Sequence, residues 1–349
     1  MAETVSKRCY YLDLAKVVGV LIVIFAHLYS IDSPVRLYTH GYHMPFFFLV
    51  SGIFHRYTGK IDWERYARTI LWPILIFIFL SILTNILFFG ANLVDQLRFY
   101  SIDIAKGKIN MIIWFLFALF WCKVYMDFFC KFRHKIIPVI IWGCVMFIPV
   151  YFFRTRIPFG ISQGMMGFPF YALGFLGKDF FLKRRESFKW LVPFALCLVS
   201  TVLITKYLQG RASMLGVNFG DLGGHLFGDA FQGLPTVCRG IMRLLNYSLF
   251  YLNGLIGSAM ILSFSLLPFP KTRLITSLSM SLITVLGTQS IFLNAFLGRL
   301  GTDNGYLLSL GLSVVIFFLC YLMHLVLKPV YDLVKPRPAT QGSQENKPQ

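Results

Sequence analysis

The sequence predicts an all-α fold, a polytopic integral membrane bundle of about ten transmembrane helices with both termini cytoplasmic. The first observation behind this prediction is composition: the 349 residues are 57% hydrophobic and 14% charged, whereas a soluble domain is roughly 25% charged. The second is that the apolar residues form runs of about 18–25, long enough to cross a hydrocarbon core of about 30 Å as helices. Helices are favoured because every backbone amide in hydrocarbon has to be hydrogen-bonded internally.

The candidate spans, in chain order, are residues 10–30, 38–55, 69–90, 110–130, 136–153, 162–181, 188–208, 241–267, 274–297 and 305–327. Each is an apolar run that ends at polar or charged residues. We expect residues 1–335 to form one transmembrane domain and the polar, proline-bearing tail 336–349 to be a disordered cytoplasmic segment.

The third observation is the distribution of positive charge. With the N-terminus inside, the predicted inner segments carry roughly twice as many Lys and Arg residues as the outer ones, in line with the positive-inside rule. This bias accounts for the net charge of +18 without a nucleic-acid partner. We therefore expect a multi-pass protein of the bacterial inner (plasma) membrane, in contact with membrane lipids. The seven Cys residues include no CxxC pair, so neither a zinc site nor a disulfide framework is expected.

The longest predicted outer loop, residues 209–240, contains Asp221, His225 and Asp229 at a spacing of four. On a helix these side chains would share a face and could bind a metal ion. The glycines between them disfavour a regular helix. We therefore prefer a solvated lid or an acceptor-binding loop and expect no metal.

The first predicted helix contains three ionisable residues, Asp13, Lys16 and His27. Lys16 and His27 are eleven residues apart, which places them on one helical face about 16 Å apart along the axis. Asp13 lies one turn before Lys16 and could pair with it. Ionisable residues within a span usually face the bundle interior and mark a functional path. The alternatives are that Lys16 snorkels to the inner headgroups and that His27 only makes an inter-helix hydrogen bond.

The second predicted span enters from the outside, so His43 falls at a depth similar to that of His27. Two imidazoles at matched depth could act as a base and its partner near neutral pH. His40 lies nearer the surface, and we expect His55, at the inner end, to be interfacial. Ser51, followed by a glycine, permits a close helix approach.

The inner loop that follows contains Arg65 and Arg68, one turn apart before an apolar run. Such a pair could bind a phosphate-bearing donor from the cytoplasm. The alternative, which the loop taken alone favours, is plain positive-inside topology with contacts to anionic lipid.

These segments resemble the start of the membrane-bound acyltransferase-3 family, in particular its sugar O-acetyltransferase branch, which includes fucose O-acetylase-like proteins. The family's first-helix pattern is Arg or Lys, ten residues, then His, and Lys16 and His27 fit it. Its second-helix pattern, Phe-Phe, two residues, Ser-Gly, is matched at residues 47–52. Looser matches are a Trp-Phe-Leu helix around Trp114 and a helix with a Gly-x-x-Ser motif at Gly287 and Ser290. We expect Ser51, Trp114 and Ser290 to line the site.

Two positions depart from the family pattern. Arg65 and Arg68 are closer together than the Arg pair of some members. Leu293 or Asn294 stands near the place where many members have a histidine in the late helix. These departures leave the manner of donor binding and the identity of the acceptor open.

The resemblance implies acetyl-CoA, or a similar acyl-CoA, as the cytoplasmic donor and a hydroxyl of a cell-surface or lipid-linked glycan as the acceptor. We expect Lys16, its partner Asp13, and the Arg65–Arg68 pair at the donor phosphates, with the pantetheine arm reaching toward the histidines. His27 would act as general base, with His43 as hydrogen-bonding partner or oxyanion donor. A relay through an acyl-histidine is also open.

The principal alternative function is a polytopic transporter or flippase of a saccharide or small molecule, because that class also places ionisable residues within its spans. Transporters often show internal repeats, and the sequence shows none. A glycosyltransferase with a lipid-phosphate donor would need acidic residues in an early outer loop, where only Asp32 stands. The acceptor sugar, the acyl chain length and the oligomeric state are not determined by the sequence.

Overall fold

The computed structural model describes residues 9–30, 33–105, 113–131, 158–209, 236–300 and 305–334. These residues form helices and connecting loops, with no strand among them. The predicted span 136–153, the tail 336–349, Asp32 and the outer-loop residues Asp221, His225 and Asp229 lie outside the described part of the chain.

The helices, in chain order, are α1 (Tyr10–His27), α2 (Pro34–His40), α3 (His43–Ile53), α4 (Trp63–Tyr66), the π-helical turn η1 (Ala67–Leu71), α5 (Trp72–Phe89), α6 (Leu93–Ala105), α7 (Ile113–Cys130), η3 (Pro158–Gly160), α9 (Ile161–Leu176), α10 (Lys178–Leu182), η4 (Phe188–Trp190), α11 (Leu191–Gln209), α12 (Thr236–Ser265), α13 (Arg273–Met280), α14 (Leu282–Leu300) and α15 (Tyr306–Val334).

Six described helical segments are long and apolar enough to cross a membrane, and α13 with α14, which are bent by 75° at their junction, make up to a seventh. All of them fall on predicted spans. The prediction of an all-helical, multi-pass membrane protein is therefore confirmed for the described residues. The predicted span 162–181 forms the shorter α9, of 16 residues, followed by α10.

The predicted span 38–55 is not one continuous helix. α2 ends at His40, and α3 begins at His43 after a break at Gly41 and Tyr42. Gly41 fits this break because a Cβ there would collide with the Asn253 side chain. The 11 residues of α3 measure only about 16 Å, half of a hydrocarbon core. The histidines therefore stand at a helix junction within the bundle.

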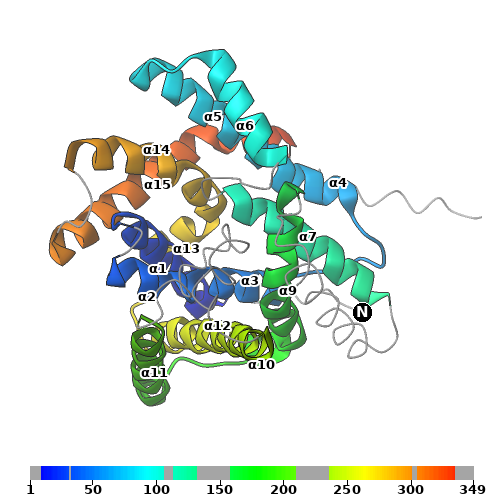
Figure 1. Ribbon diagram of the computed structural model, residues 1–349, viewed down its shortest axis with the longest axis vertical. Helices are drawn as coiled ribbons and strands as arrows, with labels where there is room; N and C mark the ends of the chain where they lie inside the picture. Colours follow the sequence, from blue (N-terminus) through cyan, green and yellow to red (C-terminus); the bar gives the residue numbers. More distant parts are fainter. Residues whose placement is uncertain are drawn as a thin grey trace, which may run out of the picture.

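A helix that we had not predicted, α6, occupies most of the predicted outer segment between the third and fourth spans. It lies against α5 (Figure 1), and Asn85 Nδ2 donates a hydrogen bond to Gln96 Oε1 over 2.8 Å between the two helices. Several apolar side chains of α6 are exposed, among them Leu93, Val94 and Leu97. Its mixed polar and apolar sequence hides it from a search for continuous apolar runs.

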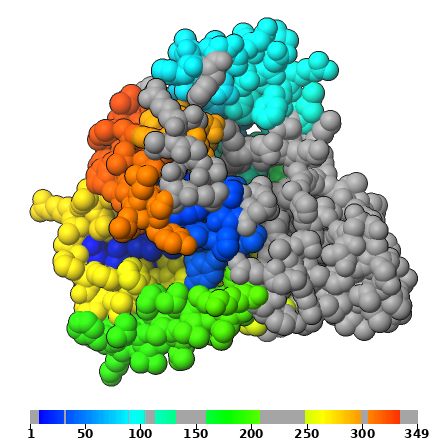
Figure 2. Space-filling model, turned by 60° about the vertical axis from the view of Figure 1, so that its left-hand side comes forward, coloured from blue at the N-terminus to red at the C-terminus, as the bar shows by residue number. Residues whose placement is uncertain are grey.

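Figure 1 shows α1 and α3 in the middle of the bundle, with α5 and α6 above, α11 and α12 below, and α14 and α15 to one side. α1 contacts α3, α12, α13, α14 and α15, and α3 contacts α9 and α12. Figure 2 shows α5–α6 in cyan and α14–α15 in orange on the outer surface. The outward faces of α5, α11 and α15 carry exposed Leu, Val and Phe side chains. This arrangement is expected of helices that face lipid around a buried central pair.

α3 and α9 approach each other at two glycines. A Cβ at Gly52 would collide with the carbonyl oxygen of Tyr171, and a Cβ at Gly174 would collide with the carbonyl oxygen of Leu49. Small residues at a helix interface allow backbones to come this close. The contact fixes α3, and with it Ser51, relative to the bundle.

We expect Gly52→Ala to destabilise the protein by about 1–3 kcal/mol, because overpacking against a backbone carbonyl forces the two helices apart. The measurement is the midpoint of unfolding of the purified protein in detergent. Gly311→Ala on α15 is the matched control, since a Cβ there meets nothing within 4 Å. Equal midpoints for the two variants would contradict the close approach of α3 and α9.

Candidate functional site

The predicted pair on α1 forms and is anchored to a second helix. Lys16 Nζ lies 3.6 Å from Asp13 Oδ1. Ser279 Oγ, on α13, donates a hydrogen bond to the same Asp13 oxygen over 2.6 Å, and Asp13 is only 4% exposed. The Lys16 ammonium also lies 4.0 Å from the centroid of the Phe54 ring. Lys16 therefore contacts a carboxylate that is itself bound to α13 and a ring just after the end of α3.

A cavity of about 270 Å³ opens beside Lys16, and we call it the lysine cavity. Its polar lining consists of Lys16, Ser51, Lys123 and Ser279. The rest of its lining is apolar and comes from α3, α7, α13 and α14. Two of the residues predicted from the sequence, Lys16 and Ser51, line this cavity. Lys123, on α7, was not among the predicted site residues.

A second cavity, of about 290 Å³, lies where the start of α5 meets the end of α15, and we call it the inner cavity. Arg68, His324 and Lys328 contribute its basic groups, and Asp332 adds a carboxylate. Arg68 Nη2 is 2.5 Å from Glu64 Oε1, and the Glu64 side chain is largely exposed whereas that of Arg68 is partly exposed. Thr284 Oγ1 lies 2.8 Å from His324 Nδ1 and so orients that ring.

The two cavities adjoin each other at the bend between α13 and α14. Met280 and Ile283, on either side of this bend, line both cavities. In the predicted orientation, the start of α1, the start of α5 and the end of α15 are all at the cytoplasmic side. The basic side chains of both cavities are therefore grouped around one end of the bundle.

The two predicted histidines, His27 and His43, are at the opposite end of α1. There, three imidazoles contact one another edge-to-face in a row of His27, His40 and His43, which we call the histidine cluster. The ring centroids of His27 and His40 are 5.5 Å apart, and those of His40 and His43 are 4.7 Å apart. His43 Nδ1 lies 2.7 Å from the carbonyl oxygen of Thr39. Because a carbonyl only accepts, this nitrogen carries the proton, and His43 Nε2 is left as an acceptor.

The ring of His40 stands between those of His27 and His43, so the structure brings the two predicted histidines together only through a third imidazole. His40, which we had placed nearer the surface, is thus part of the cluster. Among the described residues, no group of three or more His, Cys, Asp or Glu side chains is arranged to hold a metal ion.

The histidine cluster and the lysine cavity do not share a lining residue in the described part of the chain. Between them the Phe-rich α3 packs against Gly19 of α1: a Cβ there would be 2.6 Å from Phe46 Cε1 and 3.1 Å from Phe47 Cζ. Phe47 also lines the lysine cavity. The aromatic rings of α3 therefore separate Lys16 from His27, although both residues lie along α1.

Three predicted residues, Arg65, Trp114 and Ser290, lie away from these groups. Arg65, half-buried, is in α4, where its backbone N–H donates to Asp62 Oδ1 over 3.1 Å. Arg68 follows in the π-helical turn η1, and the change of helix type alters the angle between the two side chains. Trp114 packs edge-to-face on Phe115, with centroids 6.2 Å apart, and Ser290 is buried within α14.

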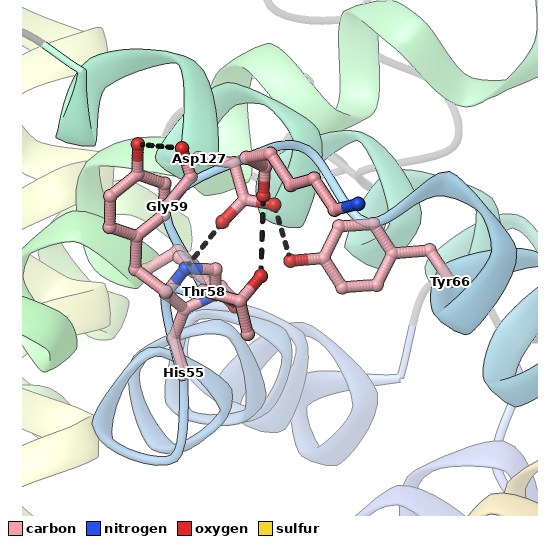
Figure 3. Close-up of polar contacts among 8 residues, drawn as sticks. His55, Thr58, Gly59, Tyr66 and Asp127 are labelled. Carbon is pink, nitrogen blue, oxygen red and sulfur yellow. Dashed lines mark hydrogen bonds and ion pairs between the residues drawn. The ribbon is translucent and has the colours of Figure 1, made fainter. Parts of the chain in front are cut away.

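A buried polar network that the sequence analysis missed joins the end of α3 to α4, α7 and α9. Asp127 lies between His55 and Tyr66 (Figure 3), with Oδ1 3.1 Å from His55 Nε2 and Oδ2 accepting from the Tyr66 hydroxyl over 2.6 Å. The other ring nitrogen of His55, Nδ1, lies 2.8 Å from the Tyr171 hydroxyl. We call these four residues the Asp127 network.

The expectation that His55 is interfacial is wrong, because His55 and Asp127 are each 1% exposed within the protein. A signal for the network was present in the sequence. Lys123 and Asp127 are ionisable residues one turn apart in an otherwise apolar helix, and such residues usually face the bundle interior.

Comparison with known proteins gives one result. The sequence model of a family described as "Acyltransferase domain" matches residues 10–325, which is most of the chain. No curated protein and no solved structure matches the chain. The matched range includes the lysine cavity, the histidine cluster and the Asp127 network.

We expect Asp127→Ala to destabilise the protein by about 3–5 kcal/mol, because removal of one partner leaves the other buried groups uncompensated. The double variant His55→Leu/Asp127→Leu should lose less stability than the two single variants lose in sum. Unfolding in detergent, followed by near-UV circular dichroism, measures both. Asp95→Ala, an exposed carboxylate on α6, is the control. If Asp127→Ala loses as little stability as the control, the Asp127 network does not stabilise the protein as we infer.

Proposed function

The chain belongs to the acyltransferase-3 family, and on this premise we propose that it is an O-acetyltransferase of the bacterial inner membrane. It transfers the acetyl group of cytoplasmic acetyl-CoA to a hydroxyl of a cell-surface or lipid-linked glycan. The observation that carries the proposal is the division of α1: a basic cavity at Lys16, and imidazoles at the other end of the same helix.

The donor enters through the inner cavity in this proposal. Arg68 and Lys328 supply positive charge for the 3′-phosphate of the nucleotide, and the adjoining lysine cavity receives the next part of the molecule. The charged nucleotide stays at the cytoplasmic end. Only the uncharged pantetheine arm extends along α1, over a distance similar to the about 16 Å rise from Lys16 to His27.

The histidine cluster supplies the proton transfer. His27 takes the proton from the acceptor hydroxyl as the oxygen attacks the thioester carbonyl carbon. The carbon–sulfur bond then breaks, and the proton passes to the leaving thiolate, so that coenzyme A departs as the thiol. His43 does not touch His27 directly, since the His40 ring lies between them. Its Nδ1 is hydrogen-bonded to the Thr39 carbonyl oxygen. Because Phe47 lies between the lysine cavity and His27, the arm reaches the cluster only if that ring rotates.

A transporter or flippase shares the composition and the buried charges, but family membership favours the enzyme. Release of coenzyme A thiol distinguishes an acyltransferase from a transporter or flippase. Purified protein with acetyl-CoA and a glycan acceptor releases coenzyme A thiol only if it is an acyltransferase.

We expect His27→Gln to lower the rate of acetyl transfer by roughly 100-fold or more, since general base catalysis contributes about 10²–10⁴. Thiol release from acetyl-CoA and mass spectrometry of the glycan measure the rate and the added acetyl group. Lys183→Ala, at an exposed position after α10, is the control for handling and insertion. A correctly inserted His27→Gln protein with the activity of the control would refute the catalytic assignment.

We expect Arg68→Ala to raise the KM for acetyl-CoA by about tenfold without lowering kcat, because an ionic contact to phosphate made equally in ground state and transition state affects binding alone. Arg68→Lys should retain part of the affinity. A fall in kcat at unchanged KM would instead place Arg68 near the reacting atoms and contradict the proposed donor path.

A further inference from the structure

Lys123 has no role in the proposed mechanism, although it lines the lysine cavity with Lys16. The two cations differ in their surroundings. Lys16 has the Asp13 carboxylate 3.6 Å from its ammonium. Lys123 has Asp127 one turn later on α7, but that carboxylate is directed to His55 through Oδ1 and to Tyr66 through Oδ2.

The contact that the structure shows for the Lys123 ammonium is with an aromatic face. Nζ lies 5.6 Å from the centroid of the Tyr66 ring, a distance typical of a cation–π contact. The Tyr66 ring is itself fixed, because its hydroxyl donates to Asp127 over 2.6 Å. The Asp127 network thus holds the surface on which the Lys123 ammonium rests.

A lysine that snorkels places its ammonium among lipid headgroups. Lys123 instead lines a cavity whose other polar groups are Lys16, Ser51 and Ser279 and whose remaining lining is apolar. A cation in such surroundings is costly unless a counter-charge compensates it. Asp127, one turn along α7, provides negative charge near Lys123, but its oxygens are directed to His55 and Tyr66. An anionic ligand in the cavity would add to that charge, and it would meet ammonium groups from both α1 and α7.

We propose that Lys123 is a further donor-binding residue, which together with Lys16 binds the diphosphate of the coenzyme A thioester, and that Tyr66 and Asp127 are positioning residues for it. This inference rests on the proposed function. The diphosphate fits the lysine cavity because it carries two negative charges and precedes the uncharged arm. The nucleotide then lies in the adjoining inner cavity, past Met280 and Ile283.

Binding of truncated donors tests the role of Lys123. Protein in lipid nanodiscs is equilibrated with coenzyme A, with dephospho-coenzyme A, which keeps the diphosphate, or with pantetheine, which lacks it. We expect Lys123→Ala to raise the Kd of the first two ligands by about tenfold or more, as for loss of a charge-assisted contact, and to leave pantetheine binding unchanged. Lys123→Arg should keep most of the affinity.

Lys131→Ala, at an exposed position just after the same helix, is the matched control and should bind all three ligands as the unmodified protein does. If Lys123→Ala and the unmodified protein bind coenzyme A equally, the inference is overturned while the proposed function stands. Equal weakening for pantetheine and coenzyme A would also overturn it, because the effect would then be structural. If the unmodified protein binds no coenzyme A, both proposals fall.

A separate measurement tests Tyr66 as a positioning residue. Tyr66→Phe keeps the ring and removes the hydroxyl that Asp127 fixes. We expect a several-fold rise in the KM for acetyl-CoA at unchanged kcat and unchanged KM for S-acetyl-pantetheine. A parallel loss with both donors, or none with either, would contradict the assignment of Tyr66 as a positioning residue.

Discussion

The interaction on which the site depends is the compensation of charge within helix α1. Asp13 and Lys16 stand in a helix whose other contacts are mostly apolar, and a carboxylate or an ammonium alone would be costly there. Their mutual contact and the Ser279 hydrogen bond reduce this cost and also tie α1 to α13. As a result, the bend between α13 and α14 lies beside Lys16, and the lysine and inner cavities meet at that bend.

The same need for charge compensation applies to the other cations of the two cavities, which come from several helices. Lys16 comes from α1, Lys123 from α7, Arg68 from the turn before α5 and Lys328 from α15. Like charges repel, so a cluster of cations from separate helices destabilises the empty bundle unless each has its own counter-charge or ring contact. Asp13 and the Phe54 ring contact Lys16, Glu64 contacts Arg68, and the Tyr66 ring contacts Lys123. An anionic ligand that binds there would strengthen the contacts among the helices.

Much of the fold was predictable because a membrane span is a local property of the sequence. Apolar runs located the long helices, and the helical period correctly placed Asp13 beside Lys16. The place at which α2 ends depends on Gly41, and the sequence does not show this because Gly41 acts through its contact with Asn253, more than 200 residues away.

The candidate site was predictable only in part, for the same reason. His55 follows α3, Asp127 is in α7 and Tyr171 is in α9, so no periodicity in one segment reveals their contact. The separation of Lys16 from His27 depends on the packing of Phe46 and Phe47 against Gly19. Spacing along α1 fixes the two residues on one face, but it cannot show which side chains of a neighbouring helix fill the space between them.

This aromatic partition has a consequence for the chemistry. In the proposed reaction, a continuous aqueous passage from the lysine and inner cavities to the histidine cluster would let water compete with the acceptor hydroxyl for the thioester. Phe47 lines the lysine cavity and packs beside Gly19 of α1, and in the proposed mechanism its ring would close that passage until the arm binds. Because an aromatic side chain moves by rotation about only two bonds, it can yield to a narrow, uncharged arm and still block the nucleotide. The division of α1 into a basic end and an imidazole end would then make hydrolysis slow without any moving domain.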